Sequence, residues 1–241
     1  MQVLIPLSKD DIITKFSPIS EEKQQEVKQI YTRYNQLYDT MYAHDNKLNF
    51  ILGIENVILH SVQKEFVVEE WKKHFSHCED DNYVYFLRPY LKEFLQALFT
   101  NFRVGIWSNS DKERTSWIVH HIVCQLGTVD GKKPEICFVY CQDEYVDCYK
   151  TSIFAHKEIK YVTRKYPQFR LFRTRIIDVI PGVQQTNDHW CVPLQQFFVY
   201  LNMKQGANKE RYHSPFVGNK ASVKDDALLK LIPWLLELSH K

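Results

Sequence analysis

Short apolar runs alternate with amphipathic stretches along most of the chain. Runs rich in β-branched and aromatic residues, bounded by polar or turn-forming residues, predict buried strands. We expect such strands over residues 48–52, 83–87, 102–107, 136–140 and 175–180. Helical spacing of apolar positions predicts helices that begin at Pro89 and at Ser110, and a basic helix over 157–165. This alternation predicts an α/β fold, a parallel sheet with helices on both faces.

The two ends of the chain have patterns of their own. Residues 1–46 predict an N-terminal helical arm, since apolar residues recur at helical spacing after Ser17-Pro18. Four tyrosines and four other apolar residues make this stripe: Val27, Ile30, Tyr31, Tyr34, Leu37, Tyr38, Met41 and Tyr42. Such a stripe lies either on its own domain or on a partner. At the other end, residues 204–224 predict a long loop, and Asp225-Asp226 predict the cap of a final leucine-rich helix. We therefore expect the arm, 1–46, and one domain, 47–241.

Composition and charge narrow the class of protein. The chain has 7 glycines in 241 residues, and no two have the G-x-G or G-x4-G-K spacing of a phosphate-binding loop. A formal charge of +2 gives no global field that attracts nucleic acid or membranes. Without a bilayer-length apolar run or a signal-peptide core, we expect an intracellular protein with no membrane span. The nucleus or cytoplasm is the expected compartment, with the mitochondrion as the alternative.

Two stretches resemble the C-terminal-domain phosphatase (NLI-interacting-factor-like) branch of the haloacid dehalogenase superfamily. Residues 87–110, LRPYLKEFLQALFTNFRVGIWSNS, are similar to that branch's Arg-Pro helix and to the following strand, which ends in Ser or Thr. Residues 225–239, DDALLKLIPWLLELS, are similar to its closing helix with an internal proline. The resemblance extends over residues 47–240 and leaves the arm outside. It implies a haloacid-dehalogenase-like fold.

The resemblance also implies a phosphatase site, and this chain departs from it. In active relatives an Asp at the end of the first strand attacks phosphorus, and an Asp two residues later is the general acid and base. The segment FILGIENVILHS places Gly53 and Glu55 at these positions. Gly53 has no carboxylate with which to form an aspartyl phosphate. By the same resemblance, Ser108 matches the hydroxyl that hydrogen-bonds the phosphoryl group, and Lys157 matches the lysine that neutralises its charge.

Lys150 and Lys160 are alternatives to Lys157 as the lysine that neutralises the phosphoryl charge. The metal motif of the family is incomplete in this chain. Asp178 matches the first acid of that motif, but Val179 follows where active relatives have Asp or Asn. Because Mg²⁺ requires near-octahedral oxygen ligation, we expect weak or no magnesium binding and no catalytic residues. The favoured alternative for Ser108, Lys157 and Asp178 is structural: a strand end, a solvated helix charge and a turn cap.

These positions have a predicted arrangement in space. The strand ends at 53–55, 108–110 and 178 would meet in one crevice if the three strands are neighbours. In that crevice we expect Glu55 and Lys157 to form an ion pair that carries out no chemistry.

Two groups of cysteines and histidines are candidate metal sites. Cys137, Cys141 and Cys148 have a spacing that matches no familiar zinc pattern, even with the upstream His120, His121 and Cys124. Buried thiols are the favoured alternative, and all six cysteines fit reduced thiols better than disulfides. We expect His74, His77 and Cys78 to belong to a polar flap over the crevice.

The stretch from 157 to 175 is basic, with seven basic residues against one acid and with interleaved aromatics. It is the candidate surface for an acidic or phosphorylated protein partner, or for RNA. The candidate binding residues are Lys157, Lys160, Arg164, Lys165, Arg170 and Arg173. In the alternative, the aromatics face the core while the charges face water.

The sequence predicts a pseudophosphatase, a phosphatase-like domain without activity that binds protein as a scaffold or as a subunit of a larger assembly. The first alternative is a magnesium-dependent phosphoserine/phosphothreonine phosphatase in which Glu55 replaces the lost carboxylate. The second alternative is an RNA-binding subunit that uses residues 157–175.

Overall fold

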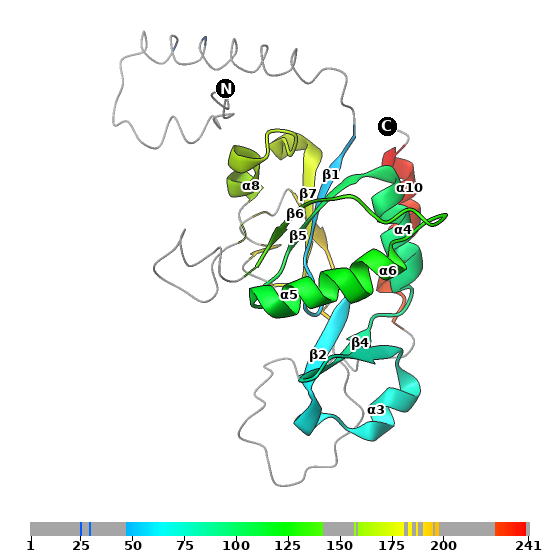
Figure 1. Cartoon of the computed structure of the whole chain (residues 1–241). Coiled ribbons are helices and arrows are strands. Elements are labelled where there is room, and N and C mark those ends of the chain that lie inside the picture. The colour runs from blue at the N-terminus through cyan, green and yellow to red at the C-terminus, as the bar shows by residue number, and fades with distance from the viewer. Residues whose placement is uncertain are drawn as a thin grey trace.

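A five-stranded parallel sheet lies between two layers of helices, with a smaller antiparallel sheet beside it (Figure 1). The computed structural model describes residues 25, 29, 47–141, 157, 159–180, 183, 184, 187, 190–194, 196, 197 and 225–239. In the order β6-β5-β1-β7-β8, the strands of the large sheet are Ile136–Tyr140, Arg103–Trp107, Asn49–Leu52, Thr174–Asp178 and Cys191–Pro193. All four pairings are parallel, which confirms the α/β prediction.

Alternating side chains of β1 explain why helices cover both faces of the sheet. Successive residues of a strand point to opposite faces. Phe50 and Leu52 pack into the core beneath α4 and α10, whereas Ile51 packs into the core on the side of α8. The first layer contains α4 (Leu91–Asn101), α5 (Lys112–Ile118), a π-helical turn (Val119–Val123), α6 (Cys124–Leu126) and α10 (Ala227–Ser239). The second layer contains α8 (Ile159–Lys165) and a short 3₁₀ turn (Leu171–Arg173).

The smaller sheet, which we call the cap sheet, is inserted between β1 and α4. Its order is β2-β4-β3, and both pairings are antiparallel. The elements of this insertion are β2 (Leu59–Gln63), a 3₁₀ turn (Lys64–Phe66), α3 (Glu69–His74), β3 (His77–Glu79) and β4 (Tyr83–Leu87). The strand predicted over 83–87 is therefore present, but it belongs to the cap sheet and not to the parallel sheet.

Two helix starts test the predicted caps. Asp225 caps α10 as predicted, with its Oδ1 accepting a hydrogen bond from the Ala227 amide at 2.9 Å. The helix predicted to begin at Ser110 begins at Lys112, and Asp111 is its cap, accepting from the Arg114 amide at 2.9 Å. Ser110 does not cap this helix because its hydroxyl hydrogen-bonds a Glu55 carboxylate oxygen at 3.2 Å.

Most of the predicted arm and the predicted loop over 204–224 lie outside the described residues. Gln25 and Gln29 are the two described residues of the arm. Both are helical and exposed.

Among the glycines of the described residues, Gly105 in β5 leaves the least room for an added Cβ atom. A Cβ atom at this position would lie 2.1 Å from the ring of Phe138 on β6. That ring is buried and has neighbours of its own, stacking on Tyr166 at 4.6 Å and meeting Phe169 edge-on at 5.0 Å between ring centroids. The ring therefore has little room in which to move away from a larger residue at 105.

We expect Gly105→Ala to lower the free energy of unfolding by about 1–3 kcal/mol, the usual cost of overpacking a core. Urea denaturation of the full chain measures this change. In a Phe138→Leu background the same substitution is expected to cost less, because the smaller side chain leaves room for the methyl group. An equal cost in both backgrounds would contradict the proposed clash.

Candidate functional site

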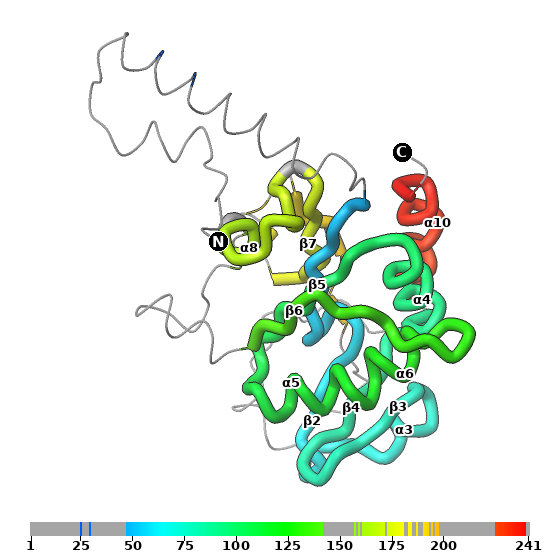
Figure 2. The backbone as a smooth tube through the Cα atoms, turned by 45° about the horizontal axis from the view of Figure 1, so that its top comes forward, coloured from blue at the N-terminus to red at the C-terminus, as the bar shows by residue number. Residues whose placement is uncertain are grey.

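The carboxyl ends of the three central strands, β5, β1 and β7, meet at one edge of the large sheet (Figure 2). Gly53 follows β1, and its amide donates to the Ile177 carbonyl of β7 at 2.9 Å. Ser108 follows β5, and Asp178 is the last residue of β7. Because all three are parallel neighbours, the structure brings these positions together as the sequence predicts.

Lys157 and Asp178 form a buried ion pair at this edge. Lys157 Nζ lies 2.6 Å from Asp178 Oδ2 and donates to the Trp107 carbonyl at 2.7 Å. Asp178 Oδ1 accepts hydrogen bonds from the amides of Val179 and Ile180, at 2.8 and 3.0 Å. The two side chains are 2% and 1% exposed. Lys157 is therefore not the solvated helix charge of the structural alternative, whereas Asp178 does cap the turn that follows its strand.

Gly53 has no room for a side chain beside this ion pair. An added Cβ would lie 2.8 Å from Asp178 Oδ2, 3.0 Å from the Val57 side chain and 3.1 Å from the Ile177 carbonyl oxygen. Contacts this short require the neighbours to move. Asp178 is held by Lys157 and two backbone amides, and Ile177 is in the sheet ladder. A side chain at position 53 would therefore require at least one of these neighbours to shift.

Glu55 pairs with Arg114 of α5, and not with Lys157 as the sequence analysis expected. Arg114 Nη2 lies 2.5 Å from Glu55 Oε1, and both side chains are about one-fifth exposed. The Ser61 hydroxyl of β2 lies within 2.8–2.9 Å of both carboxylate oxygens. The expected partner cannot reach Glu55, since the Lys157 ammonium is buried between Trp107 and Asp178.

Arg114 also joins the parallel sheet to the cap sheet. Its guanidinium lies 4.2 Å from the centre of the Tyr83 ring on β4, a cation–π distance. Neither Arg114 nor Ser61 was predicted from the sequence as a member of the site. The spacing of Arg114 in the sequence could have indicated it, because Arg114 comes about one helical turn after Ser110.

Ser108 takes a structural position at the end of β5. It is fully buried, and its hydroxyl accepts a hydrogen bond from the Ser110 amide at 3.0 Å. Its own amide donates to the Tyr140 carbonyl of β6 at 2.8 Å. These contacts agree with the structural alternative for Ser108, a residue that ends a strand.

His60 adds no charge to the cap sheet at neutral pH. Its Nδ1 lies 2.8 Å from Asn56 Oδ1. Burial, assisted by the positive charge of Arg114, lowers the pKa of His60 to about 4. The imidazole is therefore neutral at pH 7, and Arg114 carries the positive charge that faces Glu55.

The donor set at the strand ends does not fit a magnesium ion. Magnesium prefers several oxygen ligands in octahedral geometry. Gly53 and the buried Val179 supply no side-chain oxygen, while the carboxylate oxygens of Asp178 and Glu55 are held by hydrogen-bond donors. Across the described residues, no group of three or more His, Cys, Asp or Glu side chains is arranged to hold a metal. Cys148, part of the zinc candidate, lies outside those residues.

The second histidine candidate lies in the cap insertion. His77 and Cys78 are in β3, and His74 is the last residue of α3.

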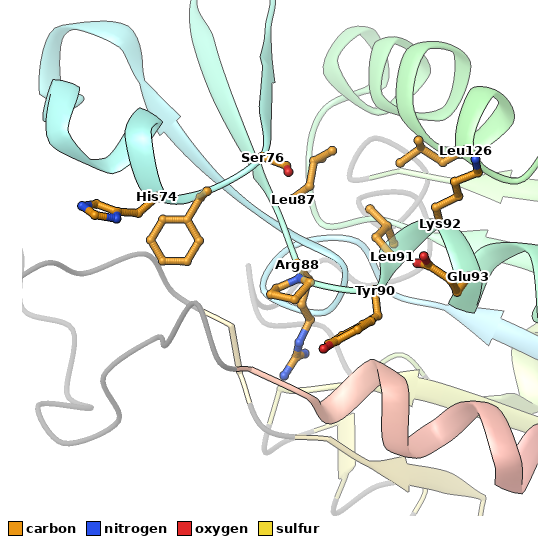
Figure 3. A pocket seen from close by; sticks show the side chains of 11 residues that line it. His74, Ser76, Leu87, Arg88, Tyr90, Leu91, Lys92, Glu93 and Leu126 are labelled. Atoms are coloured by element: carbon orange, nitrogen blue, oxygen red, sulfur yellow. The ribbon is translucent and has the colours of Figure 1, made fainter.

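A separate hollow of about 390 Å³ lies between α3, the end of β4 and the first turn of α4 (Figure 3). Figure 3 shows Arg88 extending from it toward α10, where it pairs with Asp225 at 3.0 Å. The lining of this hollow includes none of the positions at the strand ends.

The basic stretch does not form one continuous surface. Lys157 is in the buried ion pair and Arg170 is 8% exposed, so neither belongs to a binding patch. Arg164 and Lys165 are exposed on α8, and the Lys165 ammonium lies 5.0 Å from the centre of the Tyr140 ring. The side chain of Lys160 is outside the described residues, as is Lys150. Binding through the remaining exposed cations stays a prediction.

Residues 48–241 match the family model of NLI interacting factor-like phosphatases. Two CTD phosphatase-like proteins 355R, from Invertebrate iridescent virus 3 and Invertebrate iridescent virus 6, are each 24% identical to the chain over 167 and 160 residues. These matches cover 64% of this chain and 87% and 88% of the viral proteins.

Among solved structures, Fcp1, "an essential RNA polymerase II CTD phosphatase", aligns with a TM-score of 0.54 at 16% identity. The alignment covers 83% of this chain and 64% of the Fcp1 chain, and it is a likeness of fold. The chain thus spans less than two thirds of that structure.

None of the helices in the described part of the chain is long and apolar enough to cross a membrane.

We expect Lys157→Met to lower the free energy of unfolding by about 3–5 kcal/mol, because it leaves the buried Asp178 carboxylate without its counter-ion. Urea denaturation measures the change. Adding Asp178→Asn should restore part of the loss, since a neutral amide still accepts from the Val179 and Ile180 amides. Lys112→Met, at an exposed lysine of α5, is the matched control and should change stability by less than about 0.5 kcal/mol. Equal losses in the single and double variants would contradict the ion-pair explanation.

Proposed function

The chain belongs to the NLI interacting factor-like phosphatase family, and we propose that it is a member without phosphatase activity that acts by binding another protein. The observation that carries this proposal is the lack of space at Gly53. In the mechanism that the family resemblance implies, a carboxylate at this position attacks phosphorus. A residue without a side chain cannot perform covalent catalysis of this kind.

The environment of Glu55 supports the same proposal. A general acid must carry a proton to the leaving oxygen and then take one from water. Glu55 instead accepts hydrogen bonds from Ser61 and Ser110 and pairs with Arg114. Each of these partners is a donor that occupies a carboxylate oxygen and restrains its position. Glu55 is better placed to hold the cap sheet against α5 than to exchange protons with a substrate.

The proposed partner is a protein with an acidic or phosphorylated segment. Support comes from the exposed cations of α8, Arg164 and Lys165, which lie beside the aromatic rings of Tyr161, Tyr140 and Tyr166. Acidic and phosphorylated peptides are commonly recognised by such cations. The role as a scaffold or as a subunit of a larger assembly, and the compartment, stay part of the proposal.

We expect the full-length chain to release no phosphate above background from p-nitrophenyl phosphate or from a phosphoserine peptide, with or without added Mg²⁺. Glu55→Gln should give the same background rate as the wild-type chain. Glu113→Gln, at an exposed acid of α5, is the matched control for a contaminating phosphatase. Turnover that is lost in Glu55→Gln and kept in Glu113→Gln would overturn the proposal in favour of an enzyme with a rearranged site.

Restoring the nucleophile alone is expected to destabilise the protein without creating activity. Gly53→Asp places a Cβ against Asp178 and the Ile177 carbonyl, and it adds a second carboxylate beside the first. We expect the free energy of unfolding to fall by about 3 kcal/mol, the upper end of overpacking costs, with a smaller loss for Gly53→Ala. Urea denaturation and the phosphatase assay measure both effects. A Gly53→Asp variant with unchanged stability would mean that the pocket has room for a nucleophile.

A further inference from the structure

The C-terminal helix α10 has apolar residues along one flank as well as on its inner side. Leu228 and Leu235 are fully buried against the sheet, whereas Leu229 and Leu236 are each 42% exposed. Pro233 is exposed and Ile232 is half-buried between them. These four positions are spaced i, i+3, i+4 and i+7, so they lie along one side of the helix. We call Leu229, Ile232, Pro233 and Leu236 the outer stripe.

An exposed apolar flank on an otherwise amphipathic helix is a candidate contact surface. Lys230 and Glu237, the two ionisable residues of α10, lie on the side opposite Leu228 and Leu235, so the outer stripe runs between a charged side and the buried side. Five large apolar side chains are classed as exposed in the described part of the chain, and two of them are Leu229 and Leu236. Apolar side chains that gather on one surface in this way mark a contact with another segment.

We propose that the outer stripe is the docking surface for the N-terminal arm of this same chain, residues 17–46. The arm carries an apolar stripe of matching character, from Val27 to Tyr42. At 100° per residue, Gln25 and Gln29 fall on the side of the helix opposite this stripe. Both are exposed in the structure, which agrees with an arm that turns its apolar side to a surface.

The arm joins the domain beside α10. Lys47 and Leu48 lead into β1, and Leu48 packs against the same core as Trp234 of α10. The next aromatic residue, Phe50, meets Trp234 edge-on with 6.2 Å between ring centroids. Both views place the start of β1 near the C-terminal end of α10 (Figures 1 and 2). The few residues between Tyr42 and β1, at about 3.3–3.6 Å each when extended, are long enough to bring the arm onto this helix.

The two segments also match in length. The arm stripe from Val27 to Tyr42 would extend about 24 Å as a helix, at about 1.5 Å per residue. α10 has 13 residues and extends about 20 Å by the same rise. An arm that ends near the C-terminal end of α10 would therefore run along the whole of the outer stripe, parallel to α10.

The size of the outer stripe favours a tethered occupant over a second copy of the chain. A stable interface between separate proteins buries about 800 Å² on each partner, with about 20–30 residues a side. Four side chains on one helix provide much less than that. A segment joined by a short linker needs less contact, because the linker raises its effective concentration to about the millimolar range.

Limited trypsin digestion of the full chain, followed by mass spectrometry, tests the proposal. Cleavage after Arg33 reports the release of the arm, and cleavage after Lys92 reports loss of the domain fold. We expect the variant Leu229→Gln/Leu236→Gln to raise the rate after Arg33 about tenfold while leaving the rate after Lys92 unchanged, since proteolysis follows the population of the open form. The arm variant Tyr38→Gln/Met41→Gln, which leaves the residues beside Arg33 intact, should have the same effect.

Combining the two variants should raise the rate after Arg33 no further, because both remove the same contact. Val139→Gln, at an exposed apolar residue of β6, is the matched control and should change nothing. An unchanged rate after Arg33 in both variants would overturn the proposal, as would additive effects. Light scattering adds a separate outcome. A dimer that becomes a monomer in Leu229→Gln/Leu236→Gln would show that a second copy, and not the arm, covers the outer stripe.

Discussion

The buried pair of Lys157 and Asp178 is the interaction on which the site depends. Its two charges are almost completely removed from water, a cost that is balanced only if both are paired and fully hydrogen-bonded. The Trp107 carbonyl satisfies a second donor of the ammonium, and two amides satisfy the other carboxylate oxygen. The pair therefore connects the end of β5, the turn after β7 and the start of the α8 segment. We infer that this pair specifies one arrangement of the strand ends more than it adds net stability.

The position of this pair explains why the two acids at the strand ends, Asp178 and Glu55, have different cations as partners. The Lys157 side chain is buried at the ends of β5 and β7, whereas Glu55 follows β1 on the side of the cap sheet. Glu55 is then matched by Arg114, which reaches it from the first turn of α5 and packs on Tyr83. The first pair closes the end of the parallel sheet. The second connects that sheet to the cap, so each acid has a cation and neither cation is shared.

The sequence predicted the parts of this structure that depend on local pattern. Strands β1, β5 and β7 are largely buried and β6 is partly exposed, and the predicted positions of all four agree with the structure to within two residues. Strands β2 and β3 of the cap sheet were missed because they are short and largely half-buried or exposed, without a clear period. The positions that meet at the strand ends were predicted from topology, but their partners were not. Which cation pairs with Glu55 depends on how deeply Lys157 is buried and on the direction of α5, and neither is encoded in local spacing.

The family resemblance gives this pairing a physical interpretation. By the resemblance, Lys157 matches a lysine that neutralises a phosphoryl group and Asp178 matches an acid of the metal motif, and both assignments stay expectations. In this chain position 53 is a glycine and position 179 a valine, and the buried lysine and the buried acid face each other as unlike charges at hydrogen-bonding distance. Each can then serve as the counter-ion of the other. The direct contact of 2.6 Å is what electrostatics favours for two such groups in a medium of low polarity. A substrate or an ion would have to compete with that contact before it could use either group.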